Sequence, residues 1–451
     1  MLAKCTSLHQ LRKALHSLPT TLEETYDRIF LNISEESRDN AVKLLQWLAF
    51  SARPLALVEM AEVFAIDRGE VRFDPDQRPR EPRTIPDICS SLITISYTTV
   101  HEDDYGNPLR GLPASVVESG ILSLAHLSVK EYIISQRVKD SYYHLDKKLA
   151  DSAISRECLA YLFQFDTVDC LCDQSEAAIS FGRYAAEYWI THARSDDDVM
   201  QHDVQELVAR LLCSSNVHFD NWITLFDVDK DYHSSYSLKS SYNVPHPLYY
   251  ASRLGLGPIA NALVLSGALP YVNLIGGSYG SALVSASAGG HKDVVQILLE
   301  NGADVNMAGG YDGSALATAS AFDHKDVVQI LLENGADVNM AGGGYGSALA
   351  SASANGDKDV VQILLENGAD VNMAGGGNKS PLRLASANGH LAIAQILLEH
   401  GADVSLKDED GHSALRCARD ESHEAIIKLL MEHGADHDDI VINDTPMDIT
   451  Q

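Results

Sequence analysis

The stretch KDVVQILLENGADVNMAGG, residues 292–310, decides the fold, because it recurs letter for letter at residues 325–343 and 358–376. Each copy starts 33 residues after the one before it. A fixed period of about 20–50 residues indicates a repeat architecture, in which each unit buries its apolar face against the next. The identical block therefore predicts a stacked array in this part of the chain.

Each copy of the block predicts a short amphipathic helix with a defined end. In the first copy Val294 and Leu298 fall on one apolar stripe, and Gly302 can take the left-handed conformation that terminates a helix. A second helix, over residues 281–288, precedes the block and is rich in alanine, which permits close helix packing. The glycine-rich residues 309–313 then predict a turn between units.

Two antiparallel helices and a projecting turn, or finger, every 33 residues resemble the ankyrin repeat. The Gly-Ala-Asp motif of that family recurs at constant spacing, at Gly302, Gly335, Gly368, Gly401 and Gly434. The resemblance implies six units, at about 244–273, 274–306, 307–339, 340–372, 373–405 and 406–437. The family's Thr-Pro-Leu-His start reads Ser-Ala-Leu-Val at 281–284, and its His is missing in every unit. The hydrogen bonds that this His usually makes between neighbouring repeats therefore cannot be assumed.

Composition narrows the classes of function. The formal charge of −29 disfavours nucleic acid, whose phosphates require a basic surface, and it also disfavours anionic membrane surfaces. The sequence has no apolar run near the ~20 residues that span a bilayer, and the N-terminus lacks the apolar core of a secretory signal. Seven scattered cysteines are typical of reduced thiols. These features favour a cytoplasmic protein, with a nuclear location possible.

The N-terminal part carries a second resemblance. The segments are SLPTTLEETYDRIFLNI (17–33), LLQWLAFSARPLALVEMAEVFAID (44–67), ICSSLITIS (88–96) and LAHLSVKEYIIS (124–135). Together they resemble fungal NACHT–ankyrin proteins, which are NLR-like signalling ATPases. The part that is similar comprises the helices after the ATPase core and a winged-helix domain of the type named after GPI inositol-deacylase-like proteins. The resemblance covers nearly the whole chain.

The fold class that follows is mainly α: a winged-helix domain and a helical linker, followed by an α-solenoid of ankyrin repeats. The expected division is 1–36 (helical segment after a NACHT core), 37–140 (winged helix), 145–243 (helical linker), 244–437 (repeats) and 438–451 (acidic tail). Alternating residues at 92–95 and 121–124 predict paired wing strands. Two polar insertions, 68–84 and 98–120, predict mobile surface loops.

Catalytic chemistry is not expected. The phosphate-binding loop G-x-x-x-x-G-K-[ST] of the NACHT core is missing, so the chain is expected to begin where that core would end, and no cofactor or metal is assigned. Residues 276–280 match the G-x-S-x-G motif of serine hydrolases around Ser278, but the equivalent turn one repeat later has no serine in its middle. A finger of the repeat is the favoured interpretation. His126, beside Ser128, is interpreted as structural.

The candidate partner site lies on the finger tips of the repeats. Tyrosine offers a large contact area with a polar tip at low entropic cost, and repeat position predicts that the tips are exposed. Packing between neighbouring fingers is the alternative role for these tyrosines. The candidate residues are Tyr279, Tyr311, Asp312, Tyr345, Asn378, Lys379, Asp410 and His412.

The best hypothesis is a non-catalytic recognition protein that presents the concave face and fingers of its array to a protein partner. It would serve as the sensor part of an NLR-like regulator. The alternative is a regulatory fragment of a NACHT signalling ATPase whose nucleotide-binding core is absent from this chain. A hydrolase centred on Ser278 is a third and remote possibility.

Overall fold

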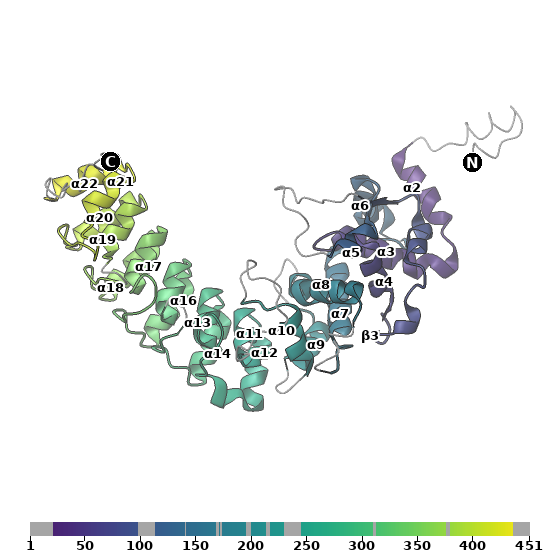
Figure 1. The fold of residues 1–451 in the computed structure, drawn as a ribbon, viewed down its shortest axis with the longest axis horizontal. Helices are drawn as coiled ribbons and strands as arrows, with labels where there is room; N and C mark the ends of the chain where they lie inside the picture. The colour runs from purple at the N-terminus through teal and green to yellow at the C-terminus, as the bar shows by residue number, and fades with distance from the viewer. Residues whose placement is uncertain are drawn as a thin grey trace, which may run out of the picture. The chain divides into compact units, whose positions relative to one another are not determined.

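The structure is a computed structural model that describes residues 21–97, 113–139, 141–167, 171, 174–194, 200–212, 217–229, 245–309, 313–375 and 379–435. The chain divides into two compact units, residues 1–211 with 215–228, and residues 212–214 with 229–451. Both are dominated by helices (Figure 1). None of the helices in the described ranges combines the length and apolar character needed to cross a membrane.

The first unit is a helical assembly with two small sheets. Its α-helices are α2 (Leu22–Leu31), α3 (Arg38–Phe50), α4 (Leu57–Phe64), α5 (Ala114–Glu118), α6 (Leu127–Ile134), α7 (Lys147–Leu162), α8 (Glu176–Ala193), α9 (His202–Leu211) and α10 (Val217–Leu225). Short 3-10 turns occupy η2 (Glu35–Ser37), η3 (Pro75–Gln77), η4 (Pro82–Cys89) and η5 (Gln136–Val138). Thr21 caps α2 by accepting a hydrogen bond from the backbone N–H of Glu24.

The main sheet of this unit has the antiparallel order β1 (Leu55–Ala56), β5 (Ile121–Leu124), β4 (Ile93–Ser96). Ile93 lies opposite Leu124, and Ser96 lies opposite Ile121. The prediction of paired strands near 92–95 and 121–124 is confirmed. α6 follows β5 directly, and its N-cap His126 accepts a hydrogen bond from the backbone N–H of Ser128, so this histidine has a structural role.

The prediction that residues 68–84 form a mobile loop is wrong. β2 (Ile66–Asp67) pairs with β3 (Arg72–Phe73), and the Phe73 ring packs edge-on against Tyr161 at 5.2 Å. The Arg78 guanidinium lies 2.8 Å from the buried carboxylate of Glu62, which also accepts a hydrogen bond from the Tyr161 hydroxyl. The local sequence is charged and proline-rich, but two of its arginines, Arg68 and Arg78, pair with buried carboxylates that lie outside the segment. Most of the second expected loop, residues 98–112, lies outside the described residues.

The core of the first unit is aromatic. Trp47, Trp189 and Trp222 are fully buried, and Trp47 packs against Phe181 while Trp189 packs against Trp222. The Trp47 indole N–H donates to Glu157 of α7, which also pairs with Arg68. The buried polar groups therefore fasten α3 and the β2–β3 segment to α7.

The second unit is a row of helix pairs that follow one another in chain order (Figure 1). The pairs are α11 (Pro247–Arg253) with α12 (Gly257–Leu263), α13 (Ala282–Ala288) with α14 (Lys292–Glu300), α15 (Ala315–Ala321) with α16 (Lys325–Glu333), α17 (Ala348–Asn355) with α18 (Lys358–Glu366), α19 (Pro381–Ala387) with α20 (Leu391–Glu399), and α21 (Ala414–Asp420) with α22 (Glu424–Glu432). The first pair continues through a π turn, η7 (Val264–Ala268), and a 3-10 turn, η8 (Leu269–Tyr271). The identical blocks form α14, α16 and α18, which confirms the predicted helix.

Sequence explains the form of each pair. Ser281 caps α13 by accepting from the N–H of Val284, and the serines at 314, 347, 380 and 413 cap the later first helices in the same way. Alanines make these first helices thin, so neighbouring pairs approach closely. After each second helix a glycine takes a positive φ, as Gly302 does at 86°, and ends the helix.

Two ladders of side chains join successive pairs. Asn306 Oδ1 accepts from the N–H of Asp337 at 2.7 Å, and its Nδ2 donates to the carbonyl of Gly335 at 3.2 Å. Asn273, Asn339 and Asn372 repeat this double contact. In the turns between paired helices, His324 Nε2 donates to the carbonyl of Ala288 at 3.0 Å, and His291, His390 and His423 make the same contact. These asparagine and histidine side chains thus make hydrogen bonds between neighbouring repeats, although the His of the family's Thr-Pro-Leu-His motif is missing.

Candidate functional site

The finger residues lie at equivalent places in separate turns, so the structure does not gather them into one pocket. Tyr279, Tyr345, Lys379, Asp410 and His412 belong to the described residues. Tyr311, Asp312 and Asn378 lie outside them. A β-bridge closes the third finger between Gly309 and Gly313, the fourth between Gly342 and Gly346, and the sixth between Lys407 and Ser413.

The finger of the second repeat is anchored at its base. The Tyr279 ring is half-buried under the guanidinium of Arg253, at 4.8 Å, and its backbone N–H donates to the hydroxyl of Tyr249. Tyr249 donates in turn to Oδ2 of Asp229 at 2.6 Å, which also accepts from the N–H of Ser278. Burial, together with the hydrogen bond to Asp229, raises the pKa of Tyr249 well above its ordinary value. The first tyrosine therefore has intramolecular contacts.

Tyr345 is also half-buried, because its ring packs against a small apolar cluster of Ala350, Ala354 and Leu384. The expectation that the finger position exposes these tyrosines is wrong for the two that the structure describes. Alanines at 350 and 354 leave space beside the first helix, and the glycine-rich turn lets the ring fold back into it. Part of each ring stays accessible to a partner.

The last finger is organised by a buried carboxylate, Asp408. It accepts hydrogen bonds from the N–H groups of Asp410 and His412 at 3.1 and 2.7 Å, and Arg383 Nη2 lies 2.6 Å from its Oδ2. Burial raises the pKa of Asp408, but the His412 N–H and the Arg383 charge outweigh it, so the pKa lies below its ordinary value. Side-chain ligand atoms of Asp408, Asp410 and His412 come within 4.8 Å of one another. Because Arg383 already neutralises the charge of Asp408, the arrangement fits a structural role in holding the finger turn better than it fits a cation site.

Ser278 lacks the environment of a nucleophile. Its hydroxyl donates to the backbone carbonyl of Asp229 at 3.2 Å, where a hydrolase would place a histidine. The turn around it is a finger, with Gly276 N–H donating to Gly280 O. The geometry supports the finger interpretation of the G-x-S-x-G motif.

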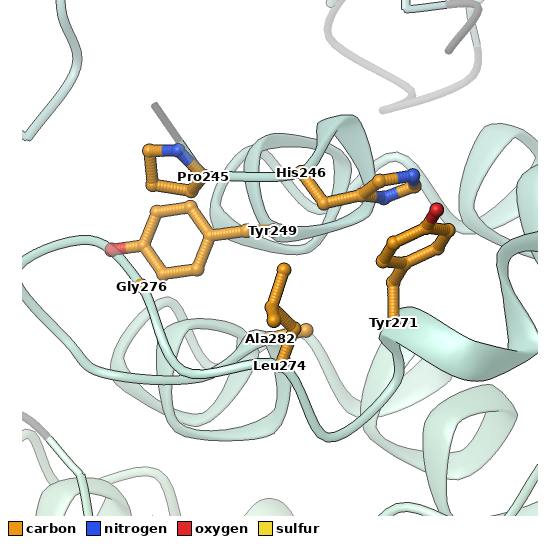
Figure 2. Close-up of a pocket in the computed structure, with 7 residues that line it drawn as sticks. All are labelled: Pro245, His246, Tyr249, Tyr271, Leu274, Gly276 and Ala282. Atoms are coloured by element: carbon orange, nitrogen blue, oxygen red, sulfur yellow. The ribbon is translucent and has the colours of Figure 1, made fainter. Parts of the chain in front are cut away.

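A small pocket lies at the base of the same finger (Figure 2). Its volume of about 10 Å³ holds at most one water molecule. The His246 and Tyr271 rings stack at its rim, 4.2 Å apart. It is lined by Pro245, His246, Tyr249, Tyr271, Leu274, Gly276 and Ala282. This space is too small for an organic substrate.

Sequence reasoning missed an exposed group of large apolar side chains at the end of the first repeat and the start of the second. This apolar cluster consists of Leu265, Leu269, Tyr271, Leu274 and Ile275. The signal was present in the sequence as a stretch from 261 to 275 that contains no charged residue. It was obscured because the first repeat diverges from the others.

Comparison with known proteins agrees with the repeat geometry. Residues 248–342 and 346–440 match the family model for ankyrin repeats. A protein of Monascus ruber named azaphilone pigments biosynthesis cluster protein L is 36% identical over 313 residues, which make up 66% of this chain and 62% of that protein. The chain therefore spans less than two thirds of the length of this curated relative.

Proposed function

The C-terminal part of the chain is an array of ankyrin repeats, and from this premise we propose that the protein is a non-catalytic recognition protein. A protein partner docks on the fingers and the concave face of the array. The single observation that carries the proposal is the regular series of finger turns, held in place by the asparagine and histidine ladders. A rigid scaffold that presents variable turns is suited to binding, because little order must be gained when the partner arrives.

Three further observations support a binding role over catalysis. The pocket at the finger of the second repeat holds no more than one water molecule. The Ser278 hydroxyl donates a hydrogen bond to a backbone carbonyl, and Asp408 forms an ion pair with Arg383. The formal charge of −29 supports a protein partner over nucleic acid. Because the relative from Monascus ruber is named as a biosynthesis cluster protein, proteins encoded beside this chain's own gene are the first partners to test.

A crosslinking experiment tests the binding site. A photo-reactive amino acid is placed at the exposed Asp410 of the last finger, and in a control at the exposed Leu149 of the first unit. We expect the finger position to crosslink to one defined protein and the control position to give no such product. Crosslinks to the same protein from the control alone would overturn the assignment to the fingers.

A finer role rests on the sequence resemblance of the N-terminal segments. We propose that the first unit contains the winged-helix domain of an NLR-like regulator, with the boundaries expected above, and that it relays partner engagement in the cytoplasm. The three-stranded sheet followed by α6 supports this assignment. The alternative is a regulatory fragment of a NACHT ATPase. An in-frame phosphate-binding loop in the genomic sequence upstream supports the alternative, and a stop codon there defeats it.

A further inference from the structure

The first repeat can be aligned with the later ones through its backbone. Leu256 precedes α12 with φ −91° and ψ 66°, close to the values of −83° and 76° at His291 before α14. Gly267 takes a positive φ of 120°, as Gly302 does at the end of α14. Leu256 and His291 are 35 residues apart, and so are Gly267 and Gly302. Counted from these two points, Leu265 stands where the second repeat has Glu300.

Leu269 follows Gly267 by two residues, as Asp304 follows Gly302, and two extra residues before Asn273 then restore the spacing of 33 to Asn306. Leu265 is 77% exposed and Leu269 is 55% exposed. Leu274 and Ile275 continue the surface, at 47% and 68% exposure. Large apolar side chains that are exposed close together in the chain are candidates for an interaction site, because hydration of apolar area is costly.

In the later repeats these positions are acidic. Exposed carboxylates recur every 33 residues, and we call them the acidic rows: Glu300, Glu333, Glu366 and Glu399, with Asp304, Asp337, Asp370 and Asp403. Within the described ranges, none of these eight carboxylates forms an ion pair. The lysines of the same blocks lie at the opposite helix end, where Lys292 and Lys325 pair with Asp326 and Asp359.

The apolar cluster adjoins the first acidic residues. Asn273, next to Leu274, accepts at its Oδ1 from the N–H of Asp304 at 2.8 Å and donates from its Nδ2 to the carbonyl of Gly302 at 3.0 Å. One edge of the array therefore carries an apolar cluster at its start, and in the four following repeats it carries carboxylates that form no ion pair among the described residues.

We propose that this edge is a docking strip for a basic amphipathic segment of a partner protein. Its apolar side chains cover the cluster of the first repeat, and its Lys and Arg side chains follow the acidic rows. Charge complementarity selects this occupant, since carboxylates at a fixed spacing match a series of basic residues and repel a second copy of this acidic chain. The inference rests on the proposed binding role, but it assigns a surface separate from the finger tips.

Fluorescence anisotropy with the full chain and synthetic peptides tests the strip. The probe is a peptide of about twenty residues with leucines at helical spacing in one half and lysines in the other. Matched peptides replace the leucines by serine or the lysines by glutamate. We expect either change, or the double variant Leu265→Ser/Leu269→Ser, to weaken binding by about tenfold, and Glu333→Gln/Glu366→Gln by about threefold. Added salt should weaken the lysine contribution.

Matched controls lie in the first unit. Leu149→Ser removes a leucine that is 64% exposed, and Glu35→Gln/Glu36→Gln removes two exposed charges. If these control substitutions weaken binding equally, or if replacing the leucines of the peptide by serine leaves its affinity unchanged, the attraction is unspecific and the proposal is overturned. A dimer of the full chain that dissociates on Leu265→Ser/Leu269→Ser in sedimentation would also overturn it. The peptide assay does not use the partner that binds the fingers. Its result can therefore be interpreted even if the crosslinking experiment on the fingers fails.

Discussion

Asp357 is the residue at which the histidine ladder is interrupted. The equivalent turn positions hold His291, His324, His390 and His423, each of which donates to a carbonyl of the preceding repeat. The carbonyl of Ala354 accepts from both Asn388 and His390, whereas the carbonyl of Ala321 is reached by Asn355. A carboxylate cannot donate the second bond. Burial, together with the charge of Asp323, raises the pKa of Asp357.

Replacing this aspartate should repair the junction. We expect Asp357→His to raise the free energy of unfolding by about 1 kcal/mol, since it adds a neutral hydrogen bond and removes a half-buried charge. Urea unfolding of the full chain measures the change. The reverse substitution, His390→Asp, should destabilise by a similar amount, and equal stability of all three proteins would contradict the role assigned to the ladder.

The raised pKa of Asp357 also predicts a pH effect. Between its raised folded value and the ordinary 3.8, the folded state binds more protons than the unfolded state, so this group stabilises the fold as pH falls through that window. Above the window it contributes a constant penalty. Asp357→Asn removes the dependence. The difference in unfolding free energy between wild type and Asp357→Asn should therefore shrink on acidification, and a difference independent of pH would contradict the prediction.

At the scale of elements, the asparagine ladder holds consecutive helix pairs in register. Asn339 accepts from the N–H of Asp370 at 2.7 Å and donates to the carbonyl of Gly368 at 3.1 Å, so it makes two bonds across one junction. Asn339→Ala should cost about 1–3 kcal/mol of unfolding free energy. Asn367→Ala is the matched control, because the described side-chain hydrogen bond of Asn367 goes to the carbonyl of Ile363 in its own repeat. Similar losses from both would refute a specific tie between repeats.

The β2–β3 segment is fastened to the first unit by ion pairs with buried acids. Arg78→Ala leaves the Glu62 carboxylate buried without its cation, which should cost about 2–4 kcal/mol even though Arg78 itself is partly exposed. The double variant Arg78→Met/Glu62→Gln should recover part of the loss, because no buried charge is left. Thermal unfolding of both variants measures this, and a double variant worse than the single one would contradict the explanation.

The elements differ in how well the sequence predicts them. The strands near 93 and 121 and the helices of the identical block follow from local periodicity, which is contained in a few adjacent residues. The order of residues 68–84 depends on Glu62 of α4 and on Glu157, 89 residues beyond Arg68, so no local pattern reports it. Tyr345 folds back because of neighbouring alanines in space. The apolar cluster is hard to recognise in the sequence because two extra residues between Gly267 and Asn273 shift the preceding part of the first repeat out of the 33-residue spacing.

At the scale of the molecule, the first unit has a specific aromatic core, whereas the second is a sum of interchangeable parts. Deleting residues 308–340 joins Met307 to Ala341, as Met340 is joined to Ala341 in the full chain, and it places the second repeat against the fourth. We expect the shortened protein to fold cooperatively, with a smaller urea dependence of stability because less surface is buried. Circular dichroism and urea unfolding test this. Loss of the helical signal would show that the repeats are not equivalent units.

In the part of the chain that the structure describes, Asn372 is the last asparagine of the ladder. The next position after Asn372 is Ser405, which donates its hydroxyl to Asp403 within its own turn. Among the described residues, which end at 435, Ser405 makes no such double contact with α21–α22, whereas His423 donates a hydrogen bond to the carbonyl of Ala387. In amide hydrogen exchange, the protons of this helix pair should be the first of the array to be replaced by deuterium. Opening of the array then proceeds from its C-terminal end toward the apolar first repeat.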